Sequence, residues 1–180
     1  MPEQTPPREI IAFERDTRAF GHRVAGVVMD EGCVLLQKAD IDDHWLVPGG
    51  RVELREPAAE SLKREMMEEI GVEVEVGRLL WVVENFFEYG GKSCHELAFY
   101  FLASLPPGSP LYDKSRTFMG YEEFFNEYTS ENRLGLTFRW FPVDDLHSIA
   151  FYPTFLKDAL QSLPENTVHV VHVDTVPGNT

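Results

Sequence analysis

Long apolar runs and cysteines are both scarce in this sequence. No apolar run approaches the roughly 20 residues that a membrane-spanning helix requires, and no signal peptide is apparent at the start. The two cysteines, Cys33 and Cys94, lie inside apolar, strand-like runs, which favours reduced residues of the core over a disulfide. We therefore expect a cytoplasmic protein with no membrane association.

Basic residues are also in short supply, and this narrows the range of partners. The chain has 16 lysines and arginines against 30 aspartates and glutamates, which gives a formal net charge of −14. Such a surface repels polyanions at long range, so we do not expect duplex DNA or RNA as a partner. A small nucleotide is compatible with this charge, because its own Mg²⁺ offsets the repulsion locally.

Length and composition predict one globular domain with a substantial core. The chain has 180 residues, and its apolar content of 43% is ordinary for a globular protein. Residues 1–9, which contain three prolines, are predicted to be a disordered lead to a single domain at residues 10–180. A long insertion rich in proline and glycine, at about residues 104–137, could contact substrate, form a homodimer surface or pack inertly.

Apolar patterning predicts several strands and a second helix, which spans residues 153–163. The dipeptide Gly90-Gly91 between two long apolar runs predicts a tight hairpin, in which Asn85 would face Glu96. The predicted strands cover residues 23–29, 33–39, 79–89, 93–104, 138–141 and 167–174.

The most informative stretch is an acidic helix that runs from Pro57 to just before Gly71. Proline suits the first position of a helix, and glycine suits a left-handed cap that ends it. The helix places Glu65 one turn from both Glu68 and Glu69, and each like-charge pair costs about 0.2–0.5 kcal/mol on an exposed helix. A hard divalent cation, Mg²⁺ or alternatively Mn²⁺, explains this clustering most simply.

The same stretch resembles the signature of the Nudix hydrolases. That signature has a glycine, five residues, a glutamate, seven residues, Arg-Glu, an apolar residue, any residue, Glu-Glu, any residue, glycine and an apolar residue. Each place is filled here, by Gly50, Glu56, Arg64, Glu65, Met66, Glu68, Glu69, Gly71 and Val72. The resemblance implies an α/β fold, the α/β/α sandwich with a mixed β-sheet, and metal-dependent hydrolysis of a phosphoanhydride bond.

The resemblance also implies roles for the residues of the signature. The implied metal ligands are Gly50, through its carbonyl, and Glu65, Glu68 and Glu69. Arg64 and Glu56 would orient these carboxylates, as outer residues of metal sites commonly do. Glu65 would either ligate the metal or take the proton of the attacking water, and Glu65, Glu68 and Arg64 form the expected catalytic set.

Members of this family often recruit one further carboxylate from outside the helix. The candidates here are Glu96, Glu122 and Glu123, although Glu96 could equally occupy a partly exposed edge of a strand. Aromatic side chains that could stack on a base are Trp45, Phe87, Tyr89 and Tyr121, each of which could instead belong to the core.

The substrate expected from the resemblance is a nucleoside diphosphate linked to another group, foremost a nucleoside triphosphate. The sequence has no proline between Pro57 and Pro106, whereas adenosine-diphosphoribose hydrolases tend to carry one there. Dinucleoside polyphosphates and nucleotide sugars remain alternatives. In another class of protein, the same fold acts as a nucleotide sensor or interaction module without turnover, which the complete set of signature glutamates disfavours.

Overall fold

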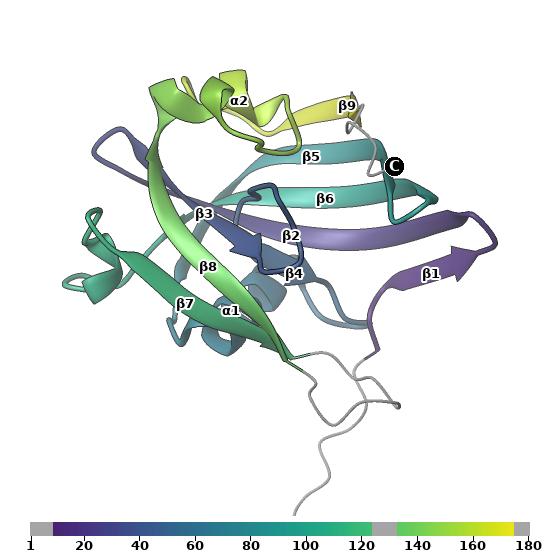
Figure 1. Ribbon diagram of the computed structural model, residues 1–180, viewed down its shortest axis with the longest axis horizontal. Coiled ribbons are helices and arrows are strands. Elements are labelled where there is room, and N and C mark those ends of the chain that lie inside the picture. Colours follow the sequence, from purple (N-terminus) through teal and green to yellow (C-terminus); the bar gives the residue numbers. More distant parts are fainter. Residues whose placement is uncertain (1–8, 124–132, 175–180) are drawn as a thin grey trace, which may run out of the picture.

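The computed structural model describes residues 9–123 and 133–174 (Figure 1). Its strands form one mixed sheet, and short helices lie on both sides of it, as an α/β sandwich requires. The elements in chain order are β1 (Ala12–Arg15), β2 (Arg18–Asp30), β3 (Cys33–Ala39), β4 (Gly49–Arg51), α1 (Ala58–Ile70), β5 (Glu75–Tyr89), β6 (Lys92–Ser104), the 3-10 turn η1 (Pro110–Tyr112), β7 (Thr117–Glu123), β8 (Arg133–Pro142), the 3-10 turn η2 (Val143–Ser148), α2 (Leu156–Ala159) and β9 (Val168–Asp174).

The sheet runs in the order β7-β8-β3-β2-β6-β5-β9, and β1 and β4 also pair with β2. The pairs β2–β6 and β5–β9 are parallel, while the other pairs are antiparallel, so the predicted mixed sheet is confirmed. Figure 1 shows α1 beside β7 and β8, and α2 at the other end of the molecule near β9. Strand β2 therefore lies at the centre and links the two halves of the sheet.

Two hydrophobic clusters fill the two faces of this sheet. Because successive side chains of a strand point to opposite faces, Val24 and Val28 of β2 belong to the cluster that contains Leu62 of α1. Ala25 and Val27 belong to the other cluster, which also holds Leu146 of η2 and Leu156 and Leu160 of the α2 region. The sheet thus separates the signature helix from the C-terminal helix.

The β5–β6 hairpin forms as the glycine pair predicts. Gly90 and Gly91 have φ angles of 57° and 74°, the left-handed values that a two-residue turn of this kind requires. Tyr89 pairs with Lys92 across the turn. Asn85 accordingly faces Glu96, in the predicted register.

The second predicted helix is shorter than residues 153–163. Only Leu156–Ala159 is α-helical, because the flanking amides form i→i−3 bonds such as Leu156 N to Pro153 O and Gln161 N to Asp158 O. The backbone N–H of Thr154 donates to Asp174 of β9 at 3.1 Å. This bond links the start of the segment to the sheet.

The segment predicted as an insertion contains regular structure. Residues 117–123 form β7, which pairs with β8 from Thr117↔Arg139 to Glu123↔Arg133. Residues 124–132 of the predicted insertion lie outside the described residues, as do residues 1–8 of the predicted lead.

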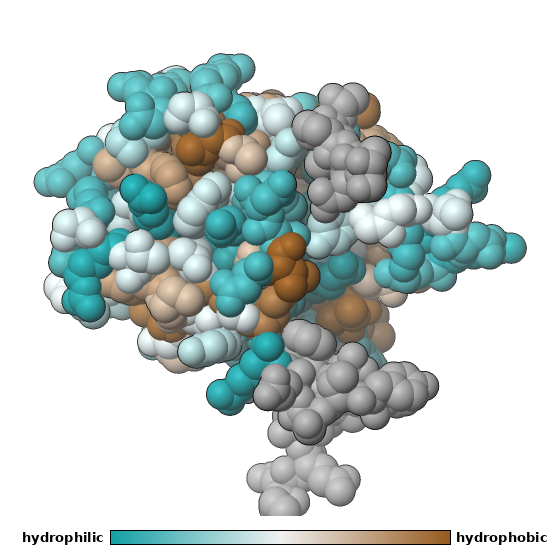
Figure 2. Space-filling model, in the orientation of Figure 1, coloured by the Kyte–Doolittle hydropathy of each residue, from teal (hydrophilic) through white to brown (hydrophobic). Residues whose placement is uncertain are grey.

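On the face shown in Figure 2, hydrophilic side chains surround small, separate hydrophobic patches. No helix among the described residues is long and apolar enough to cross a membrane. Cys33 and Cys94 are both partly buried and unbridged, as the sequence predicts.

Candidate functional site

The short strand β4 brings two glycines against the centre of the sheet. Its residues pair antiparallel with β2, so that Gly49 faces Ala25 and Gly50 faces Val24. Gly49 has a φ of 147°, and a Cβ there would lie 2.1 Å from the Val24 carbonyl oxygen. A Cβ on Gly50 would lie 2.2 Å from the carboxyl carbon of Glu65. Only glycine allows this backbone to meet the Glu65 carboxylate so closely.

Helix α1 begins and ends close to the predicted positions. Pro57 has a ψ of 137° and is therefore the extended cap, one residue before the helix starts. Gly71 adopts the left-handed conformation, with a φ of 70°, and its N–H reaches the carbonyls of Met66 and Met67. Between these caps, Glu65 and Glu69 are buried while Glu68 is exposed.

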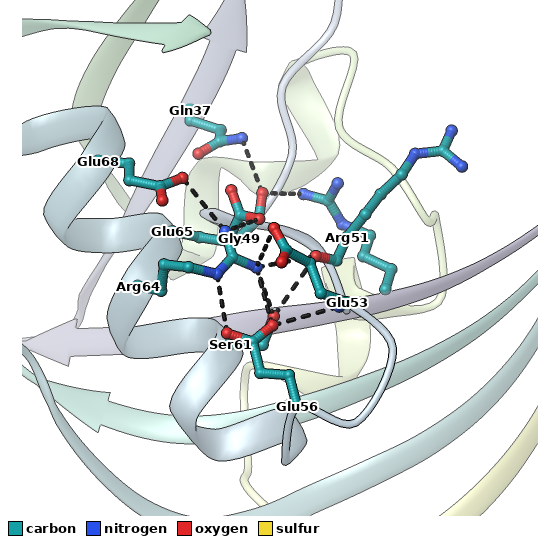
Figure 3. Close-up of polar contacts among 10 residues, drawn as sticks. Gln37, Gly49, Arg51, Glu53, Glu56, Ser61, Arg64, Glu65 and Glu68 are labelled. Carbon is teal, nitrogen blue, oxygen red and sulfur yellow. Dashed lines mark hydrogen bonds and ion pairs between the residues drawn. The ribbon is translucent and has the colours of Figure 1, made fainter. Parts of the chain in front are cut away.

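Arg64 is the central cation of the site. Its Nε and Nη2 donate to the two oxygens of Glu56 at 2.8 and 2.9 Å, a bidentate pair. Its Nη1 donates to Glu65 at 2.8 Å and to Glu68 at 3.1 Å. Figure 3 shows Arg64 between Glu56 on one side and Glu68 on the other. One guanidinium thus fixes three of the signature carboxylates.

The pKa values of Glu56 and Arg64 reflect the contact between the two side chains. Burial alone would raise the pKa of Glu56, but hydrogen bonds from Arg64 and the backbone N–H of Glu53 hold it below its ordinary value. Burial alone would lower the pKa of Arg64, but the hydrogen bond with Glu56 and the charge of Glu65 raise it. Both groups therefore stay charged, and the contact persists over the pH range in which enzymes commonly work.

Glu69 lies in a different environment. It is 5% exposed, and its Oε2 has no hydrogen-bond partner among the residues described. Burial first, and then the charge of Glu65, raises the pKa of Glu69 well above its ordinary value. Glu122 and Glu68 add to this repulsion, whereas Arg23 opposes it. Among the described residues, the charge of Arg23 therefore offsets only part of the cost of ionising Glu69.

The donor set fits a divalent cation, although the carboxylates are not arranged around one. In the part of the chain that the structure describes, no three histidine, cysteine or acidic side chains are grouped so as to hold a metal ion. Glu65 and Glu68 instead direct an oxygen at Arg64. The unpartnered oxygen of Glu69 and its contacts with like charges are what a hard cation with oxygen ligands would relieve. Gly50, Glu65, Glu68 and Glu69 are the residues that could hold it.

A cavity of about 350 Å³ opens beside Gly49 and Gly50. Of the predicted residues, Gly50, Phe87, Tyr89, Glu96 and Glu122 line this cavity. Trp45 does not line it, because its ring packs against Phe141 at a centroid distance of 4.7 Å. Tyr121 is 53% exposed on β7 and is also outside the lining, and the side chain of Glu123 lies outside the described part of the structure.

Two of the predicted site residues that line the cavity, Glu96 and Tyr89, have raised pKa values. Burial raises the pKa of the Glu96 carboxyl, and the nearby Arg23 and Arg51 only partly offset this effect. Burial also raises the pKa of Tyr89 to about 12, together with its hydrogen bond to Asp42, which measures 2.9 Å. The Tyr89–Asp42 contact joins the tip of the β5–β6 hairpin to the loop before β4, at the wall of the cavity.

Sequence reasoning missed several polar residues of the same cavity, among them Arg23, Gln37, Asn85 and Asp174. Arg23 donates to the carbonyls of Val47 and Gly49 at 3.2 and 3.0 Å and so supports the glycine strand. Gln37 and Asn85 interrupt apolar runs of the sequence, and this pattern could have identified them as site residues. A buried amide in a strand requires a hydrogen-bond partner, so its presence there needs a reason. In Figure 3 the Gln37 amide points toward Gly49, and Nε2 lies 3.4 Å from its carbonyl.

Comparisons with known proteins agree with this geometry. A family model described as the NUDIX domain matches residues 20–163 of the chain. The crystal structure of a NUDIX hydrolase from Nitrosomonas europaea is similar at a TM-score of 0.53 and 17% identity, covering 87% of this chain and 79% of that one. A MutT protein from Bacillus halodurans is similar at a TM-score of 0.52 and 19% identity, covering 84% and 89%. At these identities, the structural matches bear on the fold alone.

Similarity to a curated protein is confined to a short segment. Diphosphoinositol polyphosphate phosphohydrolase 2 from Rattus norvegicus is 39% identical over 56 residues. The matched segment covers 31% of this chain and 31% of that protein.

Proposed function

The chain belongs to the NUDIX family of hydrolases, and from that premise we propose that it hydrolyses the phosphoanhydride bond of a nucleoside diphosphate linked to another group, foremost a nucleoside triphosphate. The observation that carries this proposal is Glu69, a buried carboxylate with an oxygen that lacks a partner among the described residues, beside the like-charged Glu65. A divalent cation, Mg²⁺ or Mn²⁺, would compensate that charge. Bound there, it would neutralise phosphate oxygens and lower the pKa of a water molecule.

Some residues of the signature would bind the cation, and the others would position these ligands. Gly50, Glu65, Glu68 and Glu69 would supply oxygen atoms. Arg64 would hold Glu65 and Glu68 at the distances described above, and Glu56 would keep the guanidinium in place. Glu65 or Glu68 would accept the proton of the attacking water, because both carboxylates have a fixed orientation beside Arg64.

Among the candidates for a further carboxylate, Glu122 has the strongest support. Its charge reaches Glu69, because β7 packs against the end of α1 where Gly120 meets the backbone of Glu69. Glu96 instead lies in the cavity among Arg23 and Arg51, and burial favours its neutral form. We therefore propose Glu122 for the metal side of the site and Glu96 for the substrate side.

The partners that we propose follow from the net charge and from the cavity beside Gly49 and Gly50. A net charge of −14 disfavours duplex nucleic acid, and the cavity volume of about 350 Å³ suits a small molecule. The two unbridged cysteines agree with the cytoplasm as the expected compartment. That the protein forms a homodimer stays a prediction, which a measurement of its molecular mass in solution would test.

Turnover of a substrate panel tests the proposed function. We would assay the four common nucleoside triphosphates, a dinucleoside polyphosphate, a nucleotide sugar and a diphosphoinositol polyphosphate with Mg²⁺, Mn²⁺ or a chelator. Release of inorganic phosphate and of pyrophosphate would be read separately, which also identifies the phosphorus that is attacked. We expect metal-dependent release that is fastest with a nucleoside triphosphate.

Two other results of this panel would overturn the proposal. Faster turnover of a dinucleoside polyphosphate, a nucleotide sugar or the diphosphoinositol compound would reassign the substrate. Nucleotide binding with no release from any compound would instead identify a non-catalytic sensor.

A further inference from the structure

We infer that Gln37 and Asn85 form a hydrogen-bonding subsite for a nucleobase that carries an exocyclic amino group, a specificity that rests on the proposed nucleotide substrate. Both side chains line the cavity beside the glycine strand, and each is 5% exposed. Gln37 comes from β3 and Asn85 from β5, so the fold brings them to one cavity from strands far apart in the sequence.

Both amides present an acceptor that lacks a donor. Gln37 Oε1 and Asn85 Oδ1 are buried, and within the described residues neither has a hydrogen-bond partner. An unpaired buried oxygen of this kind costs about 1–3 kcal/mol, so such groups normally meet a donor. The orientation of Gln37 is fixed, because its Nε2 points at the Gly49 carbonyl, 3.4 Å away, and a flipped amide would place two oxygens together.

The arginines of the cavity do not meet this need. Nη2 of Arg23 already donates to the carbonyls of Val47 and Gly49, and Arg51 is an exposed residue at the end of β4. An N–H or O–H group of a ligand in the cavity would satisfy both acceptors.

The charge of the cavity disfavours a ligand with phosphates on all sides. The cavity has two arginines, Arg23 and Arg51, and four acidic residues, Asp42, Glu96, Glu122 and Asp174. Phosphate groups distributed around a ring would meet these carboxylates at short range. The aromatic rings of Phe87 and Tyr100 in the lining suit a flat, neutral ring instead.

Glu96 adds a carboxyl group to this subsite. It faces Asn85 directly across the β5–β6 pair and lines the same cavity. An exocyclic amino group carries two N–H donors, so the oxygens of Gln37, Asn85 and Glu96 match a base that bears one.

Binding of nucleosides tests the subsite without requiring turnover. We would titrate ¹⁵N-labelled protein with adenosine, guanosine or cytidine, and with purine riboside, inosine or the cytidine analogue that lacks its amino group. Each pair differs in the exocyclic amino group alone. We expect at least one amino-bearing nucleoside to bind about tenfold more tightly than its partner and to shift the side-chain amide signals of Gln37 and Asn85.

Variants identify the atoms responsible. Asn85→Leu and Gln37→Leu each remove an acceptor and should reduce the amino-group preference to about onefold to threefold. Glu84→Gln is the matched control on β5, because Glu84 is bonded to His169 at 2.8 Å and does not line the cavity; this variant should keep the preference. A second variant, Asn85→Asp, keeps the acceptor and the shape, so it distinguishes loss of the bond from loss of folding.

The outcomes separate this inference from the proposed function. Equal binding within every pair, absence of nucleoside binding, or a preference that survives both leucine variants in folded protein would overturn the subsite. A preference of this kind without hydrolysis of any triphosphate would support the subsite and refute the proposed reaction. Hydrolysis of triphosphates without the preference would support the proposed reaction and refute the subsite.

Discussion

The side chain of Glu69 combines deep burial with a carboxylate oxygen that lacks a partner among the described residues, which makes it the most sensitive single position of the site. We predict that Glu69→Gln lowers turnover by more than the roughly 10–100-fold typical of outer residues of metal sites. Without metal, the variant should unfold at an equal or higher temperature, because it removes the repulsion from Glu65. Steady-state kinetics and thermal unfolding in a chelator measure the two effects.

A matched control for this prediction is available on the same helix. Glu60 is exposed and pairs with Lys63 at 3.0 Å, so Glu60→Gln should leave turnover unchanged. Normal turnover of Glu69→Gln would remove Glu69 from the metal-binding set. A large loss of stability in that variant without metal would contradict the repulsion described for this pair.

Arg64 provides a second prediction at the scale of the residue. Arg64→Lys keeps the charge but loses the planar fork that contacts Glu56, Glu65 and Glu68 together. We expect kcat/KM to fall about 10–100-fold and the Mg²⁺ concentration for half-maximal rate to rise. Lys63→Arg, at the neighbouring position, which contacts none of these three glutamates and pairs with Glu60 instead, should change neither quantity. An unchanged Mg²⁺ dependence in Arg64→Lys would show that the fork does not position the metal ligands.

At the scale of the element, the contact between β7 and α1 connects the segment after β6 to the signature helix. A Cβ on Gly120 would lie 2.1 Å from the backbone oxygen of Glu69. We predict that Gly120→Ala pushes β7 away from the helix and destabilises the protein by about 1–3 kcal/mol, which corresponds to roughly 2–4 °C per kcal/mol in melting temperature. Because β7 carries Glu122, the rate should also fall.

Thr117→Ala is the control for this element. Thr117 is exposed on the same strand, so its loss should change the unfolding free energy by less than about 0.5 kcal/mol. Equal melting temperatures for Gly120→Ala and the unmodified protein would mean that β7 does not press on α1 in solution.

Local patterns in the sequence were sufficient to predict α1 and the β5–β6 hairpin. The caps Pro57 and Gly71 and the turn Gly90-Gly91 each act within a few residues, so their effects can be read along the chain. The register that sets Asn85 opposite Glu96 followed from the turn alone. The acidic face of the helix and its resemblance to the Nudix signature indicated the candidate metal ligands, which stay a prediction.

Long-range packing could not be predicted in the same way. Strand β7 forms because it pairs with β8 and packs on the end of α1, and neither contact is visible in its proline- and glycine-rich surroundings. The cavity joins Arg23, Gln37 and Asn85 from three strands whose order in the sheet differs from their order in the chain. The predicted helix at residues 153–163 was too long, because the residues that flank α2 form i→i−3 bonds, such as Leu156 N to Pro153 O and Gln161 N to Asp158 O.

At the scale of the whole molecule, the net charge of −14 acts against an anionic substrate before any contact forms. The Debye length is about 10 Å at 0.1 M salt and about 30 Å at 0.01 M, so low salt extends the repulsion over much of the protein surface. A positively charged enzyme would lose association rate as salt rises. Here we predict the opposite: kcat/KM for a Mg²⁺–nucleoside triphosphate should rise severalfold from about 0.01 to 0.15 M salt.

The design of this measurement must separate screening from specific ion effects. Parallel series in potassium chloride and choline chloride, at a saturating and constant Mg²⁺ concentration, should give the same rise in kcat/KM, because screening depends on ionic strength. The value of kcat should change little, since repulsion at long range affects the approach of the substrate more than the bound state. A fall in kcat/KM with salt would mean that the field at the cavity mouth is dominated by Arg23 and Arg51 and not by the 14 excess negative charges of the chain.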